Sequence, residues 1–497
     1  MKPYRARDVA PLAGLFATKR LGSGEPDGDG QSLRRHLGPW GLIALGIGSI
    51  IGAGLFALTG IAAAENAGPA VTISFLVAAL GCALAGMCYS ELATMIPMAG
   101  SAYTYAYATM GEMIAWIVGW DLVLEYAVSA AAVAASWTQY ALSLLRDVGV
   151  EFPARLAVAP FETIRLADGG EVSGLVNLPA VMIVVVLSFL LMRGIRESAA
   201  VNGVIVVIKV AIVLVFVAIG ARYIDWANYT PFIPANTGSF GEFGWSGVLR
   251  GAGMIFFAYI GFDAVSTAAQ ETKDPQRALP IGILGSLAIC TVLYVAFAFV
   301  LTGMVKYSAM RGDAAPVVTA IARTPYHWLQ ILVEIGILAG FTSVILVSLL
   351  GQSRVFLAMA EDRLVPGLFA AIHPRWRTPW LSTLLFMLFT GLLAGFLPMS
   401  LLADMTSIGT LLAFIIVCAG VLVLRRTRPD LPRPYRTPLV PLVPLLGIAV
   451  CATMMYSLGP ENWWRLVGWL AIGLAIYFGY SRRHSRRQQQ AAASPAE

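Results

Sequence analysis

Two glycine-rich stretches contain the residues of this sequence that are best suited to bind a small ligand. The first, GLIALGIGSIIGAGLFALTG, covers residues 41–60, and the second, GVLRGAGMIFFAYIGFDAVST, covers residues 247–267. Glycine costs a helix about 1 kcal/mol relative to alanine, so each cluster favours a place where a helix opens. For one stretch alone, close packing of helices through small residues is the favoured interpretation. Two such stretches in corresponding positions of two halves favour a pair of broken helices.

A broken helix can bind ligands through its own peptide groups. The N–H groups of one half and the carbonyls of the other lose their partners. The positive end of a half-helix favours an anion, and free carbonyls favour an ammonium group. A zwitterionic L-amino acid carries both groups on one carbon, so the pattern predicts a main-chain binding site for an amino acid.

Lys209 is a second candidate, because it lies in NGVIVVIKVAIVLVFVAIG, residues 202–220, which is otherwise almost wholly apolar. An ionisable residue in the middle of a membrane helix is costly and is by default a functional hypothesis. Snorkelling to the surface is the alternative, but Lys209 is far from both ends of the segment. Burial disfavours a charged lysine, so Lys209 is a candidate carrier of a proton.

Three more charged residues lie close to the predicted breaks or in an apolar helix. Glu125 follows Asp121 by four residues on the same helical face. It could pair with a basic substrate side chain or with a backbone or tyrosine group, and both interpretations stay open. Asp263 follows the second break, where it could cap the next half-helix or act in gating or proton handling. Arg250 precedes that break and could pair with an acidic group near an outer vestibule.

These candidates need a scaffold, and composition predicts an all-α polytopic membrane protein. The chain of 497 residues is 58% hydrophobic and 12% charged, whereas soluble domains have about 25% charged residues. Its apolar runs approach the ~20 residues needed to cross a bilayer and lack the alternation of barrel strands. We expect about twelve spans, at residues 38–64, 69–96, 110–142, 174–194, 197–220, 244–271, 279–305, 329–360, 379–397, 400–424, 438–458 and 462–480.

The placement of basic residues predicts the orientation. Lysine and arginine gather on one side of the predicted membrane, and examples are Arg34, Arg193, Lys273, Arg375, Arg425 and Arg482. The positive-inside rule then predicts that both termini lie in the cytoplasm. We expect the chain to be a multi-pass protein of the inner (plasma) membrane. The net charge of +6 therefore indicates topology and lipid contact, not a nucleic-acid partner.

The predicted organisation has five parts. Residues 1–37 form a cytoplasmic arm, and residues 38–424 form the working core with broken first and sixth spans. A cytoplasmic loop at 425–437 leads to two additional spans at 438–480, and residues 481–497 form a disordered cytoplasmic tail.

Several activities are not expected. None of the five cysteines has metal-ligand spacing, and the four histidines form no H-E-x-x-H pattern. There is no Walker A motif for an ATP-driven pump. We therefore expect no enzyme, no metal and no cofactor.

Four motifs strengthen this interpretation. They are GIGSIIGAGLFALTG, FFAYIGFDAVSTAAQETKDPQRALPIGI, GQSRVFLAMAEDRLVP and RPYRTPLVPLVP, and together they spread over most of residues 35–445. The chain resembles the amino acid–polyamine–organocation (APC) superfamily and, within it, the bacterial cationic amino acid transporter (CAT) family. The resemblance implies a LeuT-type fold of five plus five inverted helices with two additional C-terminal helices.

The resemblance also implies which groups bind. The substrate carboxylate would meet the N–H groups of Gly52, Ala53 and Gly54. The substrate amino group would meet the carbonyls of Ile51, Phe257, Ala258 and Ile260. In similar proteins a lysine at the position of Lys209 stands where sodium-coupled relatives bind sodium, and an acidic residue at the position of Glu125 faces the cavity. Span eight around Phe341–Leu346 would add to the side-chain pocket.

The function implied is secondary active transport, as a proton-coupled amino acid symporter that works by alternating access. An amino acid or polyamine exchanger of the same fold is the alternative.

Overall fold

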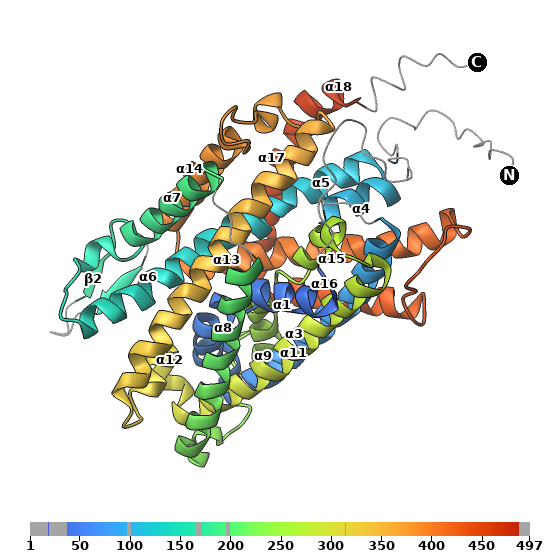
Figure 1. Cartoon of the computed structure of the whole chain (residues 1–497). Coiled ribbons are helices and arrows are strands. Elements are labelled where there is room, and N and C mark those ends of the chain that lie inside the picture. Colours follow the sequence, from blue (N-terminus) through green and yellow to red (C-terminus); the bar gives the residue numbers. More distant parts are fainter. Residues whose placement is uncertain are drawn as a thin grey trace, which may run out of the picture.

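A computed structural model describes residues 18, 37–96, 101–160, 162–165, 171–194, 199–313 and 315–486. These residues form a bundle of helices (Figure 1). The only strands among them are β1 (Thr163–Arg165) and β2 (Glu171–Ser173), which pair as one short antiparallel hairpin. The hairpin lies at the opposite end of the bundle from α4 (Ser101–Thr109) and α18 (Arg482–His484).

The long helices follow one another along the whole chain. They are α1 (Pro39–Ile50), α3 (Val71–Met95), α5 (Glu112–Val123), α6 (Ser129–Asp147), α7 (Leu178–Met192), α8 (Ala199–Gly220), α9 (Gly244–Ile255), α11 (Pro275–Met304), α13 (His327–Glu361), α14 (Trp380–Phe396), α15 (Met399–Thr427), α16 (Leu442–Ser457) and α17 (Pro460–Ile476). The short ones are α2 (Thr59–Ala62), α4 (Ser101–Thr109), α10 (Ala264–Thr267), α12 (Pro316–Ile321) and α18 (Arg482–His484).

The helices are those of a polytopic membrane protein. In the described residues, seven are long and apolar enough to cross a membrane, or eight if α16 and α17, which meet at 110°, count as one. Three shorter apolar helices are α1, α7 and α14. Glycines form two of the turns between consecutive helices: Gly111 lies between α4 and α5, and Gly459 lies between α16 and α17. Both have a positive φ (94° and 88°), which other residues rarely adopt.

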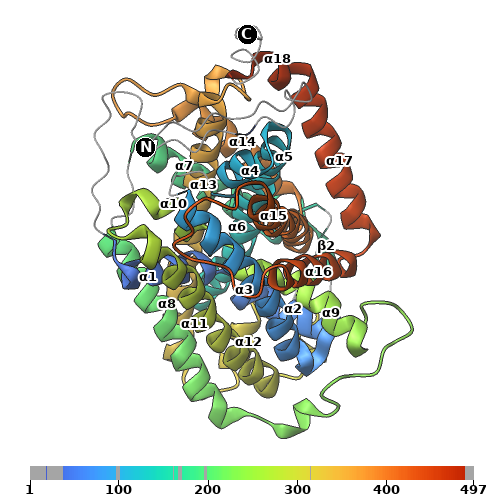
Figure 2. The same cartoon turned by 90° about the vertical axis from the view of Figure 1, so that its right-hand side faces the viewer.

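The bundle contains two groups of helices. One group consists of α1, α3, α9 and α11, and the other of α6, α7, α13 and α14; α15 contacts members of both groups (Figures 1 and 2). Helices from the two halves of the chain pair up: α3 packs on α11, α6 on α13, and α7 on α14.

The two ends of the described chain join the bundle at specific places. Leu37 pairs with Thr272 in a parallel bridge, and the N–H of Arg486 donates to the carbonyl of Asp362. The hydroxyl of Ser485, which is buried, donates to the carboxylate of Glu112. The predicted disordered tail therefore differs from the structure in its first residues, which are helical in α18 and packed. Residues 487–497 of that tail, and residues 1–17 and 19–36 of the predicted arm, lie outside the described residues.

Candidate functional site

The first glycine-rich stretch breaks its helix. α1 ends at Ile50, and Ile51 turns to an extended conformation (φ −72°, ψ 107°). A π-helical turn, Gly54–Leu58, then resumes the helix. Within the described residues, the N–H groups of Gly52, Ala53 and Gly54 make no hydrogen bond to another backbone group, as expected at the start of a half-helix.

The second stretch breaks too. α9 tightens into a 3₁₀ turn, Phe256–Tyr259, and Ile260 is extended (φ −59°, ψ 138°). Gly261 follows with φ 112°, a value that favours glycine, and α10 begins at Ala264. A side chain at Gly261 would lie 2.9 Å from the carbonyl oxygen of Ser49, so this glycine also allows the two breaks to meet.

The two breaks touch each other at Gly54. A Cβ atom there would lie 2.3 Å from Cα and 2.5 Å from Cβ of Ala258. Only glycine leaves room for this approach, so the first break needs glycine for packing as well as for helix opening.

Tyr294, which the sequence analysis did not single out, links the two breaks. It is fully buried on α11. Its hydroxyl lies 2.9 Å from the carbonyl oxygen of Ile50 and 3.0 Å from that of Ala258, so the two carbonyls share its single proton. Its helix also carries the hydroxyls of Ser286, Thr291 and Thr302, so no sequence signal distinguishes Tyr294.

A cavity lies between the two groups of helices. Its empty volume is about 530 Å³ including the open mouth. The breaks contribute Ser49, Ile50, Gly52, Ala53 and Gly54 on one side and Phe257, Ile260, Gly261 and Ala264 on the other. The facing wall consists of Glu125, Tyr126, Ser129 and Val133 together with Val344, Val347 and Ser348 of α13. The wall is therefore mostly apolar, with peptide groups at one side and a carboxylate at the other.

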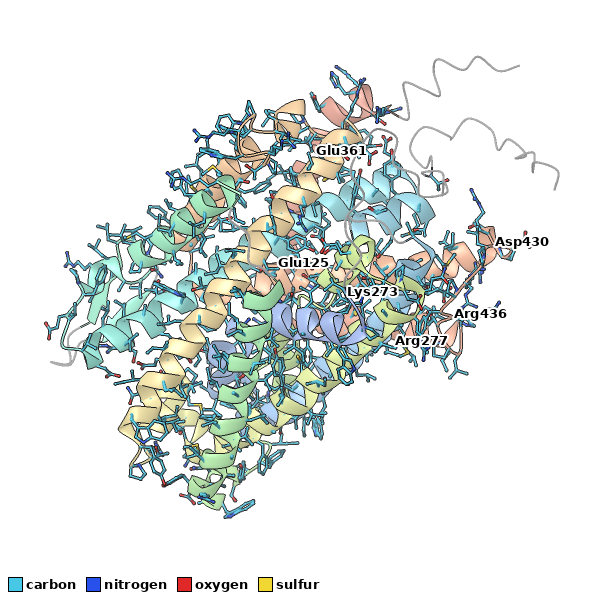
Figure 3. The ribbon with its side chains drawn as sticks, in the orientation of Figure 1. Glu125, Lys273, Arg277, Glu361, Asp430 and Arg436 are labelled. Atoms are coloured by element: carbon cyan, nitrogen blue, oxygen red, sulfur yellow. The ribbon has the colours of Figure 1, made fainter. Side chains whose placement is uncertain are left out.

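Glu125 lies in the π-helical turn Leu124–Val128 in the middle of the bundle (Figure 3). It is 2% exposed, and neither carboxylate oxygen has a hydrogen-bond partner among the described residues. Asp263 lies near enough for the two carboxyl groups to interact electrostatically. Glu125 therefore lines the cavity with its carboxylate beside that of Asp263.

Asp263 does not line the cavity, and its side chain does not cap α10. One carboxylate oxygen accepts from the hydroxyls of Ser101 (3.2 Å) and Tyr126 (3.3 Å). The side chain thus joins the second break to α4 and to the wall that carries Glu125. These partners are 162 and 137 residues away in the chain, so local sequence patterns could not reveal them.

Lys209 is buried, with 1% of its surface exposed. Its Nζ donates to the carbonyl of Gly48 at 2.7 Å. Gly340 leaves room for the lysine, because a Cβ there would lie 3.0 Å from Cε of Lys209. The side chain therefore reaches from α8 to α1 just before its break, behind the cavity and not inside it.

Arg250 forms an ion pair with Asp404, with Nη2 and Oδ2 at 2.6 Å. The same oxygen accepts from the side-chain amide of Asn462 at 2.9 Å. The pair joins α9 to the first part of α15, and Asn462 adds α17. Arg250 is thus a connection between helices and does not touch the cavity.

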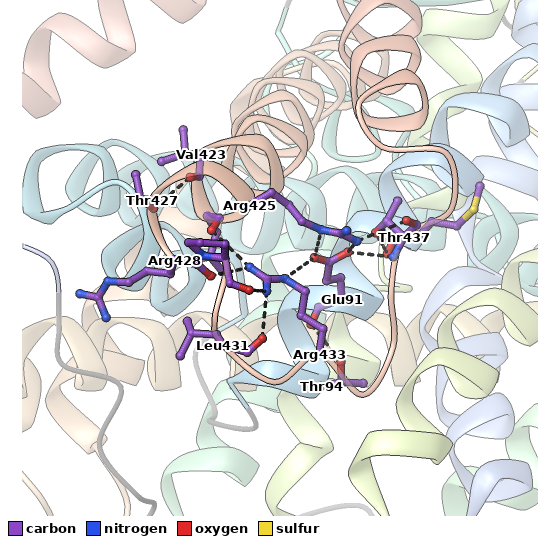
Figure 4. Close-up of polar contacts among 12 residues, drawn as sticks. Glu91, Thr94, Val423, Arg425, Thr427, Arg428, Leu431, Arg433 and Thr437 are labelled. Carbon is purple, nitrogen blue, oxygen red and sulfur yellow. Dashed lines mark hydrogen bonds and ion pairs between the residues drawn. The ribbon is translucent and has the colours of Figure 1, made fainter. Parts of the chain in front are cut away.

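A second cluster outside the predictions lies at the other end of α15 (Figure 4). Glu91 on α3 is 1% exposed. It accepts two hydrogen bonds from Arg425 and one from the N–H of Thr437, each at 2.8 Å. Arg433 lies 3.4 Å from Glu91 and donates to the carbonyl of Arg428 at 2.7 Å. This carboxylate therefore fixes the connection between α15 and α16 to α3.

The cavity brings together most of the predicted ligand residues. Gly52, Ala53, Gly54, Phe257, Ile260 and Glu125 line it, whereas Ile51 and Ala258 do not. The carbonyl of Ala258 already accepts from Tyr294. In α13 the predicted segment Phe341–Leu346 supplies only Val344, and the wall continues to Val347 and Ser348.

A membrane bundle with an internal cavity between two broken helices defines a secondary transporter and not an enzyme. The chain matches the family model described as "Amino acid permease" over residues 37–477. The chain belongs to this family of APC-superfamily permeases, secondary transporters of amino acids, and the family implies a LeuT-like fold.

Individual relatives agree with this assignment. The chain is 44% identical over 462 residues to "Branched-chain amino acid permease BcaP" of Bacillus subtilis (strain 168), which covers 92% of this chain and 96% of that protein. It is 42% identical over 476 residues to "Methylthioribose transporter" of the same organism, covering 95% and 99%. With "Cationic amino acid transporter 9, chloroplastic" of Arabidopsis thaliana it shares 42% over 400 residues, covering 80% and 67%.

Proposed function

We propose that this chain is a proton-coupled symporter that takes up L-amino acids with apolar side chains. The observation that carries the proposal is the cavity between the two breaks. Three unused N–H groups at Gly52, Ala53 and Gly54 face a substrate carboxylate. The valines of the facing wall and Phe257 of the second break suit an aliphatic side chain, and the relative named for branched-chain amino acids agrees.

The fold supports alternating access between the two groups of helices. We propose twelve spans in a five-plus-five inverted repeat, with α16 and α17 as the additional pair. Packing of each helix on its counterpart, as in α3 on α11, is what a two-fold axis in the membrane plane produces. The similarity to plant CAT proteins supports a place among the bacterial CAT transporters.

The orientation is part of the proposal. The basic connections at Lys273 and at 425–437 support a cytoplasmic location for the end of the bundle where Leu37 meets Thr272. We expect the plasma membrane and two cytoplasmic termini.

Lys209 is the proposed proton carrier. A charged Nζ holds the carbonyl of Gly48 beside the first break at 2.7 Å, and loss of the proton weakens that hold because charge-assisted hydrogen bonds are roughly twice as strong as neutral ones. Proton loading is thereby linked to the geometry of the substrate site. Asp263, tied to the second break, is a candidate for a secondary role in gating or proton handling.

The test is uptake of L-leucine into proteoliposomes driven only by a pH step. Lys209→Ala should abolish proton-driven accumulation and keep leucine binding within about tenfold of wild type. Lys306→Ala, a change at an exposed lysine, is the matched control and should accumulate leucine normally. Proton-driven accumulation by Lys209→Ala contradicts the coupling role. Uptake that requires amino acid inside the vesicles indicates the exchanger alternative.

Glu125 allows a second experiment on the substrate. If its carboxylate pairs with a basic side chain, Glu125→Gln should reduce lysine or arginine uptake by at least about tenfold more than alanine uptake, because a buried charge pair contributes over 1.4 kcal/mol. An equal loss of uptake for all substrates would mean that Glu125 binds the ammonium group common to them or has a structural role. Methylthioribose is tested alongside as a competitor of leucine uptake. Inhibition by methylthioribose would indicate that the substrate resembles that of the methylthioribose transporter, and its absence would indicate the branched-chain amino acid permease.

A further inference from the structure

A second hollow lies on the surface where α1 and α11 begin. Its empty volume is about 920 Å³ including the open mouth. Its walls include Pro39, Trp40 and Ile43 from α1, and Lys273, Arg277 and Ile281 from the start of α11. It shares no lining residue with the cavity between the breaks. Nothing in the transport cycle described above uses it.

The hollow has an excess of positive charge. Lys273 and Arg277 are exposed and, within the part of the chain that the structure describes, form no ion pair with another side chain. Figure 3 shows both at the end of α11 that lies beside α1. One carboxylate, Asp274, also lines the hollow, so the net charge of its walls is +1. The amino ends of α1 and α11 add partial positive charge.

The rim of the hollow is apolar and continues down the bundle. Trp40 is 80% exposed, and exposed tryptophan is typical of the boundary between headgroups and hydrocarbon. Below Arg277, one face of α11 presents Ile281, Ile289 and Val292 to the outside, with exposed fractions of 41%, 37% and 69%. These residues follow each other at helical spacing, so they form one apolar stripe beneath the two cations.

A ligand that fits has a negative headgroup and long apolar chains. A free phosphate or nucleotide would use the cations and leave the tryptophan and the stripe uncovered. A zwitterionic lipid would cover the stripe but gain little from two unpaired cations. Basic pockets between transmembrane helices are known to hold anionic lipid headgroups.

We propose that this hollow binds one anionic phospholipid, with its phosphate between Lys273 and Arg277, its glycerol region against Trp40, and an acyl chain along Ile281 and Val292. The lipid would contact both α11 and α1, whose far end is the first break. The proposal rests on the membrane location of the chain and not on which substrate is carried or how transport is coupled.

The test is the binding of dioleoyl phosphatidylglycerol to the purified full chain in neutral detergent, measured by native mass spectrometry. Since each basic residue near a headgroup contributes about fivefold, Lys273→Gln/Arg277→Gln should bind about 25-fold more weakly. Lys273→Arg/Arg277→Lys keeps both charges and should bind like wild type, which separates charge from folding. Arg482→Gln/Arg483→Gln, which removes two exposed arginines of α18, is the matched control and should also bind like wild type.

Three results would overturn the proposal. One is equal binding of dioleoyl phosphatidylcholine, which would mean that the hollow holds bulk lipid only. Another is equal stabilisation by water-soluble glycerol 3-phosphate, which would indicate a free anion site. The last is an equal loss of binding in the Arg482/Arg483 control. Because binding is read without transport, a failed transport assay leaves this result untouched, and a failed lipid assay leaves the proposed transport untouched.

Discussion

Gly54→Ala is the substitution that addresses the contact between the two breaks most directly. The new methyl group would lie 2.3 Å from Cα of Ala258, whereas ordinary van der Waals contact begins at 3.4 Å. The two breaks would have to separate by the difference, about 1.1 Å. The clashing atom belongs to the backbone, so no side-chain rotation can relieve the clash.

The expected effect on binding follows from this displacement. Overpacking of this kind costs about 1–3 kcal/mol, and if that cost is borne by the substrate site it corresponds to about 5- to 150-fold weaker binding. We expect the dissociation constant for L-leucine, measured by calorimetry on purified protein, to rise within that range. Uptake into proteoliposomes should fall in parallel.

Gly468→Ala is the matched control, because no atom lies within 4 Å of a Cβ placed at Gly468 in α17. Alanine there should leave binding unchanged and can raise helix stability by up to about 1 kcal/mol. The double variant Gly54→Ala/Ala258→Gly removes the 2.5 Å contact with Cβ but not the one with Cα, so it should recover only part of the affinity. Wild-type leucine affinity in Gly54→Ala would refute the close approach of the breaks as a requirement for binding.

Two other changes test the connections that the structure reveals. Glu91→Gln should lower the free energy of unfolding in a detergent titration by about 3–5 kcal/mol, because it leaves Arg425 and Arg433 without their buried charge partner. Arg426→Gln, at an exposed arginine of α15, should change the free energy of unfolding by less than about 0.5 kcal/mol. Equal effects of the two substitutions would contradict the role of the cluster. Tyr294→Phe should lower the free energy of unfolding by about 1–3 kcal/mol, since it removes the proton that two buried carbonyls share, and it should weaken leucine binding. Tyr456→Phe, at a tyrosine that is 69% exposed, should bind leucine like wild type. A Tyr294→Phe variant that also binds leucine like wild type contradicts the link between the breaks.

The positions of the helices and breaks could be predicted because they depend on local properties of the chain. Apolar runs of the length of a bilayer predict spans, and the structure has a helix or a helix pair within a few residues of each predicted limit. Glycine clusters predicted the openings after Ile50 and around Ile260. An isolated charge in an apolar run drew attention to Lys209, and its burial is as expected.

The contacts between distant parts of the chain could not be predicted. Glu91 and Arg425 are 334 residues apart, and neither stands in a pattern that differs from a charge at the end of a span. The directions of peptide groups are equally hidden, because residue types do not reveal which carbonyl faces the cavity. Ile51 and Ala258, which the family resemblance implied as ligands, are not among the residues that line the cavity.

The position of α15 explains how a cavity between two groups of helices can be held at both ends. Asp404 near its start binds Arg250 of α9, and Arg425 near its end binds Glu91 of α3, about 30 Å further along the helix. α9 and α3 belong to the same group, so the two ion pairs attach α15 to that group at both ends. α15 also packs on α6 of the other group. Relative motion of the two groups must therefore either break one of these ion pairs or slide α15 along α6. An ion pair is either formed or broken, whereas packed helices can slide past each other by small distances. Sliding at α6 with both pairs intact leaves the buried charges compensated, whereas breaking either pair leaves one of them alone.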